Sequence, residues 1–241
     1  MPLLVAAATP KELAAALRNA PELGEAPSDA GSILRRPLHG RDILLMVTGV
    51  GPINAALAAG KALAPPRDIE GVLLVGVAGT FDVERAPIGS LTAATSEAFP
   101  EFGLRTPEGV NPRGIGFSQG DAGSGGEVWD ELPLDPHGAA SRMGMDLPGC
   151  IAGPAVTVAG VTNCERILAD FAARYAPLTE NMEGFPWALA TARAGVPFLE
   201  LRSISNMVGN RTGWNLQAAL DSLAGAVPEL IRPGRTLAKG R

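Results

Sequence analysis

The sequence predicts a three-layer α/β fold, in which helices cover both faces of a sheet that has parallel character. Short apolar runs alternate with segments of helical periodicity along most of the chain. The apolar runs are continuous rather than alternating, which is typical of strands buried on both faces. Gly and Pro supply 30 and 21 of the 241 residues, as expected for many tight turns between short elements.

The first strand and the first helix are predicted close to residue 1. Residues 3–8 form a short buried apolar run that is not preceded by Lys or Arg, so a strand is favoured over a signal peptide. A capping box follows, in which Thr9 is the N-cap, Pro10 begins the helix and Glu12 folds back on the cap. A helix over about residues 10–19 is therefore expected.

A second strand and helix follow. The strand over residues 43–47 leads through Thr48-Gly49-Val50-Gly51 into an alanine-rich helix, Pro52–Leu63. Such a turn can present backbone N–H groups to a phosphate. It lacks the third glycine of the dinucleotide-binding fingerprint, and no suitable acidic residue follows about twenty residues later. A tight strand-to-helix turn is therefore the favoured interpretation.

The rest of the chain continues the alternation of strands and helices. In chain order, the expected elements are strands at residues 72–77, 89–95 and 154–161, helices at 165–175 and 183–194, a strand at 197–204 and a helix at 214–231.

The chain is expected to form a single domain over residues 1–241. Residues 99–149 differ from the rest of the chain in composition and patterning, because they are rich in Gly and Pro and have weak hydrophobic periodicity. Functional loops and tolerated insertions both have this character. The tail after Arg232 is basic and is expected to be frayed.

Composition argues against several classes of protein. The net charge is −5, from 20 basic and 25 acidic residues, so the chain lacks the excess of positive charge that is typical of proteins that bind nucleic acids. No apolar segment approaches the ~20 residues that span a bilayer, so no membrane partner is expected. The spacing of Cys150 and Cys164 fits neither a disulfide framework nor a zinc site. No metal or cofactor is expected, and a reducing cytoplasm is the simplest setting.

Three polar stretches lie beside predicted strands, near the edge at which α/β proteins bind ligands. Glu12 and Glu183 each have a structural explanation, because Glu12 completes a capping box and Glu183 lies in the first turn of a helix, whose dipole favours negative charge. Residues 202–206 are harder to explain by packing, because strand alternation would bury some of their polar side chains.

Together these pieces resemble the nucleoside phosphorylase/nucleosidase superfamily, and within it the futalosine hydrolases most closely. The resemblance runs from Leu3 to about Leu230 and implies a twisted, partly closed mixed sheet flanked by helices, assembled into homo-oligomers. It rests on the order and spacing of Val75-Gly76-Val77-Ala78-Gly79-Thr80 with Ile88-Gly89-Ser90, Asn181-Met182-Glu183-Gly184, Gly195-Val196-Pro197-Phe198 and Arg202-Ser203-Ile204-Ser205-Asn206.

The resemblance implies roles for the matching residues in N-glycosidic cleavage, which passes through an oxocarbenium-like ribosyl state. Glu183 matches the glutamate that binds the ribose 2′-hydroxyl, and its charge suits the developing cation. Glu12 matches the glutamate that positions and deprotonates the attacking water. The positions that match substrate-binding residues are Val77, Ala78, Gly79, Met182, Arg202 and Ser205.

Two departures from related nucleosidases bear on specificity. Adenine-specific nucleosidases end the Arg-x-Ile-Ser motif in Asp, whereas this chain has Asn206, the third expected catalytic residue. A carboxamide offers two N–H donors, which fit the N7 and O6 acceptors of hypoxanthine. Asn181 stands at the first position of a motif that is Glu-x-Glu in many nucleosidases. Glu180 lies one residue earlier, and its role stays open.

Water is expected to be the nucleophile. Many hexameric phosphorylases have an Arg directly before the glycine-rich turn, where this chain has Leu74. They have another Arg after the first strand, where this chain has Thr9-Pro10-Lys11. Bidentate recognition of phosphate favours a guanidinium group, so the sequence favours a hydrolase.

The resemblance therefore implies hydrolysis of futalosine to dehypoxanthinyl futalosine and hypoxanthine, a step of menaquinone biosynthesis. The 6-amino analogue of futalosine is the alternative substrate, and Asn206 favours futalosine over it. The alternatives are a methylthioadenosine/adenosylhomocysteine nucleosidase, which Asn206 disfavours, and a purine nucleoside phosphorylase. A catalytically silent nucleoside-binding or storage relative is a further alternative. The presence of both Glu12 and Glu183 disfavours that last one.

Overall fold

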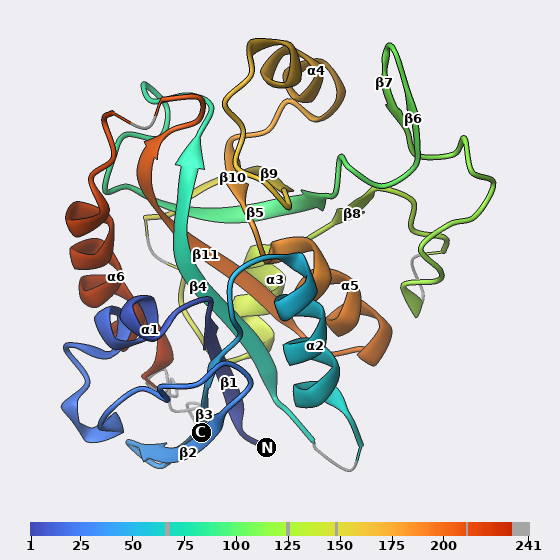
Figure 1. Cartoon of the computed structure of the whole chain (residues 1–241). Helices are drawn as coiled ribbons and strands as arrows, with labels where there is room; N and C mark the ends of the chain where they lie inside the picture. Colours follow the sequence, from blue (N-terminus) through green and yellow to red (C-terminus); the bar gives the residue numbers. More distant parts are fainter. Residues whose placement is uncertain (66–67, 124–125, 148, 211, 233–241) are drawn as a thin grey trace, which may run out of the picture.

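The computed structural model describes residues 1–65, 68–123, 126–147, 149–210 and 212–232 (Figure 1). The tail that was expected to be frayed lies outside the described residues beyond Arg232. The strands are β1 (Leu3–Ala7), β2 (Ile33–Leu38), β3 (Arg41–Val47), β4 (Gly71–Thr80), β5 (Leu91–Ala98), β6 (Leu104–Thr106), β7 (Gly109–Asn111), β8 (Glu131–Pro133), β9 (Ile151–Thr157), β10 (Thr179–Asn181) and β11 (Phe198–Met207). The helices are α1 (Pro10–Leu17), the 3-10 turn η1 (Pro21–Leu23), α2 (Pro52–Leu63), α3 (Pro136–Arg142), α4 (Glu165–Tyr175), α5 (Gly184–Ala194) and α6 (Leu216–Ile231).

Nine of the described strands form one mixed sheet, in the order β10-β9-β5-β11-β4-β1-β3-β2, with β8 paired to β5. Strands β3, β1, β4 and β11 run parallel to one another, whereas β11 and β5 are antiparallel. The short strand β10 also pairs with the end of β4, so that β4, β10, β9, β5 and β11 close into a ring. The partly closed mixed sheet implied by the family resemblance is confirmed.

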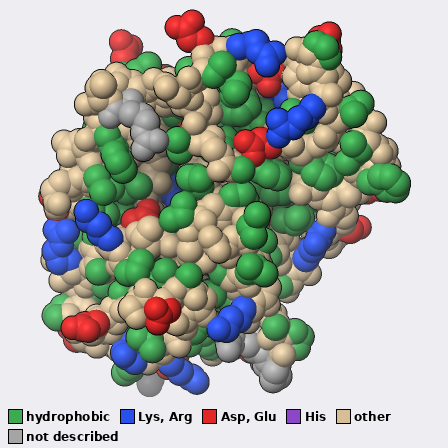
Figure 2. Space-filling view, viewed as in Figure 1, with side chains coloured by type: hydrophobic (Ala, Val, Ile, Leu, Met, Phe, Trp, Pro, Cys, Tyr) green, Lys and Arg blue, Asp and Glu red, His purple; other side chains and the backbone are tan. Residues whose placement is uncertain are grey.

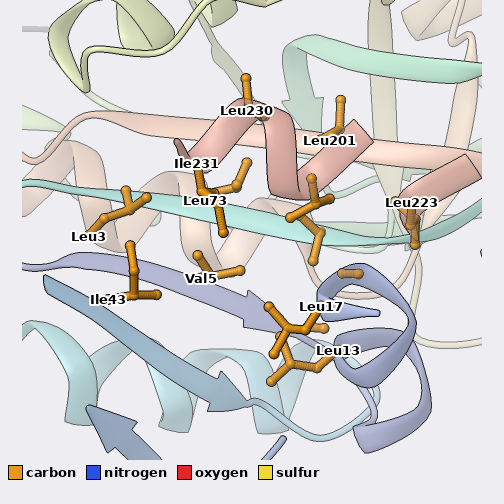
Figure 3. Packing of buried hydrophobic residues seen from close by; sticks show 14 of the residues in the cluster. Leu3, Val5, Leu13, Leu17, Ile43, Leu73, Leu201, Leu223, Leu230 and Ile231 are labelled. Carbon is orange, nitrogen blue, oxygen red and sulfur yellow. The ribbon is translucent and has the colours of Figure 1, made fainter. Parts of the chain in front are cut away.

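Helices cover both faces of the open part of the sheet, which confirms the three-layer prediction. On one face, α1 and α6 pack against strands β1, β3, β4 and β11, and Figure 3 shows their leucines meeting the strand side chains. The labelled members of this cluster are Leu3, Val5, Leu13, Leu17, Ile43, Leu73, Leu201, Leu223, Leu230 and Ile231. On the other face, α2 and α5 pack against the alternate side chains of the same strands.

The long strands β4 and β11 pair in parallel to their carboxyl ends, and a β-bulge interrupts this pairing beside the ligand-binding edge. Ile204 pairs with Ala78 and Asn206 pairs with Gly79, so Ser205 is the extra residue. A bulge bends its strand and re-aims the side chains that follow. The bulge therefore accounts for the changed direction of the strand end at Asn206, whereas Arg202 and Ser203 precede it and are buried.

Several boundaries differ from the sequence-based expectation. The strand expected at residues 154–161 is β9, which begins earlier, at Ile151, and ends at Thr157. Pro154 lies inside this strand, and it is tolerated there because the pairing of β9 with β5 shifts register after Ala94. The strand β2 was missed because its Arg35, Arg36 and Pro37 do not look like a buried strand. It is an edge strand, where charge and proline protect against further pairing.

The segment 99–149 is not a loop throughout, since β6, β7, β8 and α3 are regular elements within it. The expected helices at 10–19, 183–194 and 214–231 are slightly shorter, as α1, α5 and α6. No helix of the described residues combines the length and the apolar character needed to cross a membrane.

Candidate active site

A cavity of about 450 Å³ opens where the strands of the sheet end. Its walls come from the ends of β4 and β11, from β10, and from the first turns of α1 and α6. Ligands of α/β proteins bind at this edge. The expected site residues that line the cavity are Glu12, Val77, Ala78, Gly79, Met182, Glu183, Ser205 and Asn206.

Glu12 is part of the helix cap and of the cavity wall. The Thr9 hydroxyl accepts a hydrogen bond from the Glu12 backbone N–H (3.2 Å) and donates one to Glu12 Oε2 (2.7 Å). The backbone N–H of Val77, on β4, donates to Glu12 Oε1 (3.0 Å). Burial raises the pKa of Glu12, although both hydrogen bonds oppose this shift. The carboxyl group is thus held in one place, with a raised proton affinity that suits a general base.

Glu183 is the N-cap residue of α5 rather than a residue of its first turn, so it lies one position earlier in the helix than predicted. Its Oε1 accepts a hydrogen bond from the backbone N–H of Gly51 (3.0 Å), which precedes α2 and has φ of +91°. The glycine-rich turn therefore presents an N–H group to an anion, as such turns do, but the anion is the chain's own carboxylate.

Arg202 lies behind Glu183 and is absent from the cavity lining. Its Nη1 is 3.2 Å from Glu183 Oε2, and its Nε is 2.8 Å from Glu200 Oε1. Burial alone would lower the pKa of Arg202, but the attraction of Glu200 and Glu183 raises it above its usual value. Arg202 thus pairs with Glu183 and does not line the cavity, whereas the family resemblance implied a substrate-binding residue.

Gly76 is required for the close approach of Arg202 and Glu12 to strand β4. A Cβ at Gly76 would lie 2.7 Å from Arg202 Nη1 and 3.0 Å from Glu12 Oε1. Only the bare backbone lets the guanidinium and the Glu12 carboxylate approach the strand together.

Below Arg202 lies a buried pair of carboxyl groups that sequence reasoning missed. Glu97 is fully buried and accepts hydrogen bonds from Thr157 Oγ1 (2.7 Å) and Asn181 Nδ2 (2.5 Å). Burial and the neighbouring Glu200 raise the pKa of Glu97 well above its usual value, because the charged form is disfavoured both by burial and by a second carboxyl group beside it. A Cβ at Gly184 would overlap both carboxyl groups. The signal in the sequence was a charged residue inside each of two apolar strands, which requires a buried partner.

Asn206 is half-buried in the cavity and is partly paired with the chain itself. The Ser205 hydroxyl lies within hydrogen-bond distance of Asn206 Oδ1 (2.9 Å) and of the Ala78 carbonyl (3.2 Å). Asn206 Nδ2 donates to the Met207 carbonyl (2.9 Å). One of the two amide N–H groups is therefore used by the backbone in this structure, and one is left to donate to a ligand.

Several lining residues were not predicted. Lys11 is the one cation among the described residues of the lining, and Glu180 and Thr162 add a polar wall. The exposed apolar side chains Val50, Val161 and Trp214 also line the cavity. Loop residues such as these carry no periodic signal, so a single sequence does not mark them. Among the described residues, no group of three or more His, Cys, Asp and Glu side chains is placed to hold a metal ion.

Comparisons with known proteins agree with this geometry. The family model described as "Phosphorylase superfamily" matches residues 2–232. The chain is 35% identical over 238 residues to the futalosine hydrolase of Streptomyces coelicolor, which covers 95% of both chains. It is 31% identical over 198 residues to the futalosine hydrolase of Thermus thermophilus, which covers 81% of this chain and 84% of the relative. A crystal structure of the Campylobacter jejuni 5′-methylthioadenosine/S-adenosyl homocysteine nucleosidase superposes with a TM-score of 0.73 at 20% identity, covering 95% of this chain and 96% of that chain.

The raised pKa of Glu97 predicts a pH-dependent stability. Because the folded pKa of Glu97 is raised above its unfolded value, its contribution is full at low pH and is lost as pH rises through the folded pKa. Above pH 4.5, the ordinary pKa of a glutamate, the free energy of unfolding should fall by up to about 1.4 kcal/mol per pH unit for as long as the folded chain binds a proton that the unfolded chain has lost. Glu97→Gln does not titrate, so its stability should fall less with rising pH in urea titrations.

A matched control is Glu131→Gln, which changes an exposed carboxylate on β8 and should leave the pH dependence unaltered. Equal slopes in the Glu97→Gln variant and the parent chain would contradict the raised pKa of Glu97.

Proposed function

The chain belongs to the phosphorylase superfamily, and from this premise we propose that it is a futalosine hydrolase that releases hypoxanthine from futalosine. The observation that carries the proposal is one cavity with two fixed carboxylates, Glu12 and Glu183, and an amide, Asn206, at a strand end. The names of two relatives at 35% and 31% identity support the substrate. Menaquinone biosynthesis and the cytoplasm are parts of the same proposal.

The carboxylates divide the work of breaking the N-glycosidic bond. As the base departs, positive charge develops on the ribosyl group. Glu183 binds the 2′-hydroxyl beneath it and offers compensating negative charge without reorganisation, because Gly51 and Arg202 already hold the carboxylate. Glu12 accepts a proton from the water that attacks the anomeric carbon.

The departing base meets Asn206. The amide donates a hydrogen bond to the acceptor edge of hypoxanthine and so stabilises the negative charge that collects on the leaving group. An amide does not release its proton, so water completes the protonation of the base. Val77, Ala78, Gly79 and Met182 surround the sugar and the base, and Ser205 orients the amide.

Water rather than phosphate is the proposed nucleophile. Phosphate binding in such a cavity calls for Arg side chains in a bidentate geometry. Lys11 is the one cation that the described lining supplies, and Arg202 is already engaged by Glu183 and Glu200. The Gly51 N–H is occupied by Glu183.

We also propose a homo-oligomer. A groove of about 830 Å³ between α2 and α5 is lined mainly by apolar side chains, among them Ile53 and Leu57, which are 77% and 70% exposed. Figure 2 shows hydrophobic side chains gathered on this face, where α2 and α5 lie in Figure 1. Exposed apolar patches of this kind mark interaction surfaces. A single domain over residues 1–241 belongs to the same proposal, supported by one sheet built from both halves of the chain.

The proposal is tested by incubating the protein with futalosine, inosine and methylthioadenosine, each with and without phosphate, and following the free base. Futalosine should be cleaved with the highest kcat/KM, at a rate independent of phosphate. A preference for methylthioadenosine would indicate the adenine-specific nucleosidase, and dependence on phosphate would indicate a phosphorylase. Binding without cleavage would indicate a silent relative.

Removing the negative charge of Glu183 should impair the chemical step. Glu183→Gln keeps a hydrogen-bonding side chain but loses the charge that stabilises the ribosyl cation, so kcat should fall by roughly 10²-fold or more. Thermal unfolding checks that the variant is folded. Near-normal turnover in a folded variant would exclude this role.

The Thr9 hydroxyl should tune the general base. It donates to the Glu12 carboxylate and lowers the pKa of Glu12 against the effect of burial. Because the base must be ionised, Thr9→Val should move the acid limb of the kcat/KM profile to higher pH. The loss of the cap should also cost about 1 kcal/mol of stability.

Thr9→Ser, which keeps the hydroxyl, is the control and should retain the parent pH profile. An acid limb that stays in place in Thr9→Val would remove Glu12 as the titrating base.

A further inference from the structure

One carboxyl group of the cavity, that of Glu180, has no role in the proposed reaction. Glu180, on β10, lines the cavity and is only 7% exposed. The backbone N–H of Thr162 donates to its Oε1 (3.0 Å), whereas its Oε2 is buried and has no hydrogen-bond partner among the described residues. A buried acceptor without a donor is costly, so the cavity is incomplete until a ligand supplies one.

The register of the sheet places Glu180 opposite Asn206. In the closed ring, Gly79 of β4 pairs with Glu180 on one side and with Asn206 on the other. Directly paired residues project to the same face of a sheet, so the two polar side chains flank a glycine on one face. Two inter-strand spacings separate their Cα atoms by roughly 10 Å. All three residues line the cavity.

Thr162 fixes the orientation of the carboxyl group. Both its backbone N–H and its side chain interact with Glu180, and these contacts counteract the burial that raises the pKa of Glu180. Burial is the larger effect and leaves the pKa of Glu180 raised, while Thr162 partly offsets it and occupies Oε1. Oε2 is then held as an acceptor ready for a donor on the ligand.

The two purine bases differ at one ring atom that this acceptor would distinguish. Hypoxanthine has an N–H donor at N1, next to O6, whereas N1 of adenine is a bare acceptor. We propose that Glu180 is a specificity-determining residue that accepts a hydrogen bond from N1–H of a 6-oxopurine while Asn206 donates to the neighbouring O6 and N7 edge. This inference rests on the proposed function, because it assigns the recognition of the base that the proposed reaction releases.

The pair makes a pattern that adenine does not match. With adenine in the same position, the lone pair of N1 faces the carboxylate and the exocyclic amine faces the amide N–H of Asn206. Sites with buried polar groups reject a ligand that leaves those groups unpaired more strongly than apolar pockets reject a change of size.

The kinetic test uses Glu180→Gln, whose amide can donate to N1 of adenine. The ratio of kcat/KM for futalosine to that for its 6-amino analogue should fall by roughly 10-fold or more relative to the parent enzyme. The control is Glu101→Gln, which removes a carboxylate that interacts electrostatically with Glu180 but does not line the cavity. The control should keep the parent ratio, and an unchanged ratio in Glu180→Gln would overturn the proposal.

A binding test needs no nucleoside. The unaltered protein should bind hypoxanthine at least 10-fold more tightly than 1-methylhypoxanthine, which lacks the N1–H donor, in calorimetric titrations. In Glu180→Gln the difference between the two affinities should shrink, because the variant lacks the carboxylate that would accept from N1–H. The steric effect of the methyl group is the same in the parent and in the variant. Equal affinities for the two bases in the parent chain would overturn the proposal.

The outcomes separate this inference from the proposed function. If futalosine is not cleaved but the binding difference depends on Glu180, the recognition of 6-oxopurines stands and the proposed substrate fails. If futalosine is cleaved and neither ratio responds to Glu180→Gln, the function stands and Glu180 is not the determinant.

Discussion

The buried ion pair between Arg202 and Glu183 is the constraint on which the rest of the site depends. Each of these charges would be costly to bury alone, and each is stabilised by other partners of the chain. The guanidinium also pairs with Glu200, and the Glu183 carboxylate is bound by the Gly51 N–H. Glu200 in turn neighbours the buried carboxyl group of Glu97, whose pKa is raised. The chemistry at the cavity wall thus rests on a column of buried polar groups that reaches into the closed ring of strands.

This column explains why glycines stand at particular positions of unrelated elements. Gly76 on β4 lets Arg202 and Glu12 approach the strand, and Gly184 at the start of α5 lies against the two carboxyl groups. Gly51 has a positive φ and places its N–H toward Glu183. In the sequence these residues resemble ordinary turn and strand glycines. Their role follows only when three elements distant in sequence are brought together, which is information that no local pattern contains.

Elements with strong local signals were predicted well. The helices α2 and α4 have the predicted bounds, because Pro52 begins one and apolar periodicity defines both. The strand β10 was missed because Thr-Glu-Asn is polar and only three residues long, and it forms by pairing with both β9 and β4. Most predicted site residues do gather in the cavity, since their motifs lie at strand ends. Glu180 stayed unassigned because its importance comes from the closure of the ring, which aligns it with Gly79 and Asn206.

The bulge at Ser205 has a consequence for how such a site can evolve. Strand β11 ends its regular pairing with β4 at Ile204, and Asn206 follows the extra residue, half-buried and pointing into the cavity. A residue in this place is a poor contributor to the hydrophobic core, so exchanging it disturbs few packing contacts. Arg202, four residues earlier, is locked into the buried ion pairs. One strand therefore carries both a residue fixed by buried ion pairs and, after the bulge, a cavity residue whose exchange would leave those pairs in place.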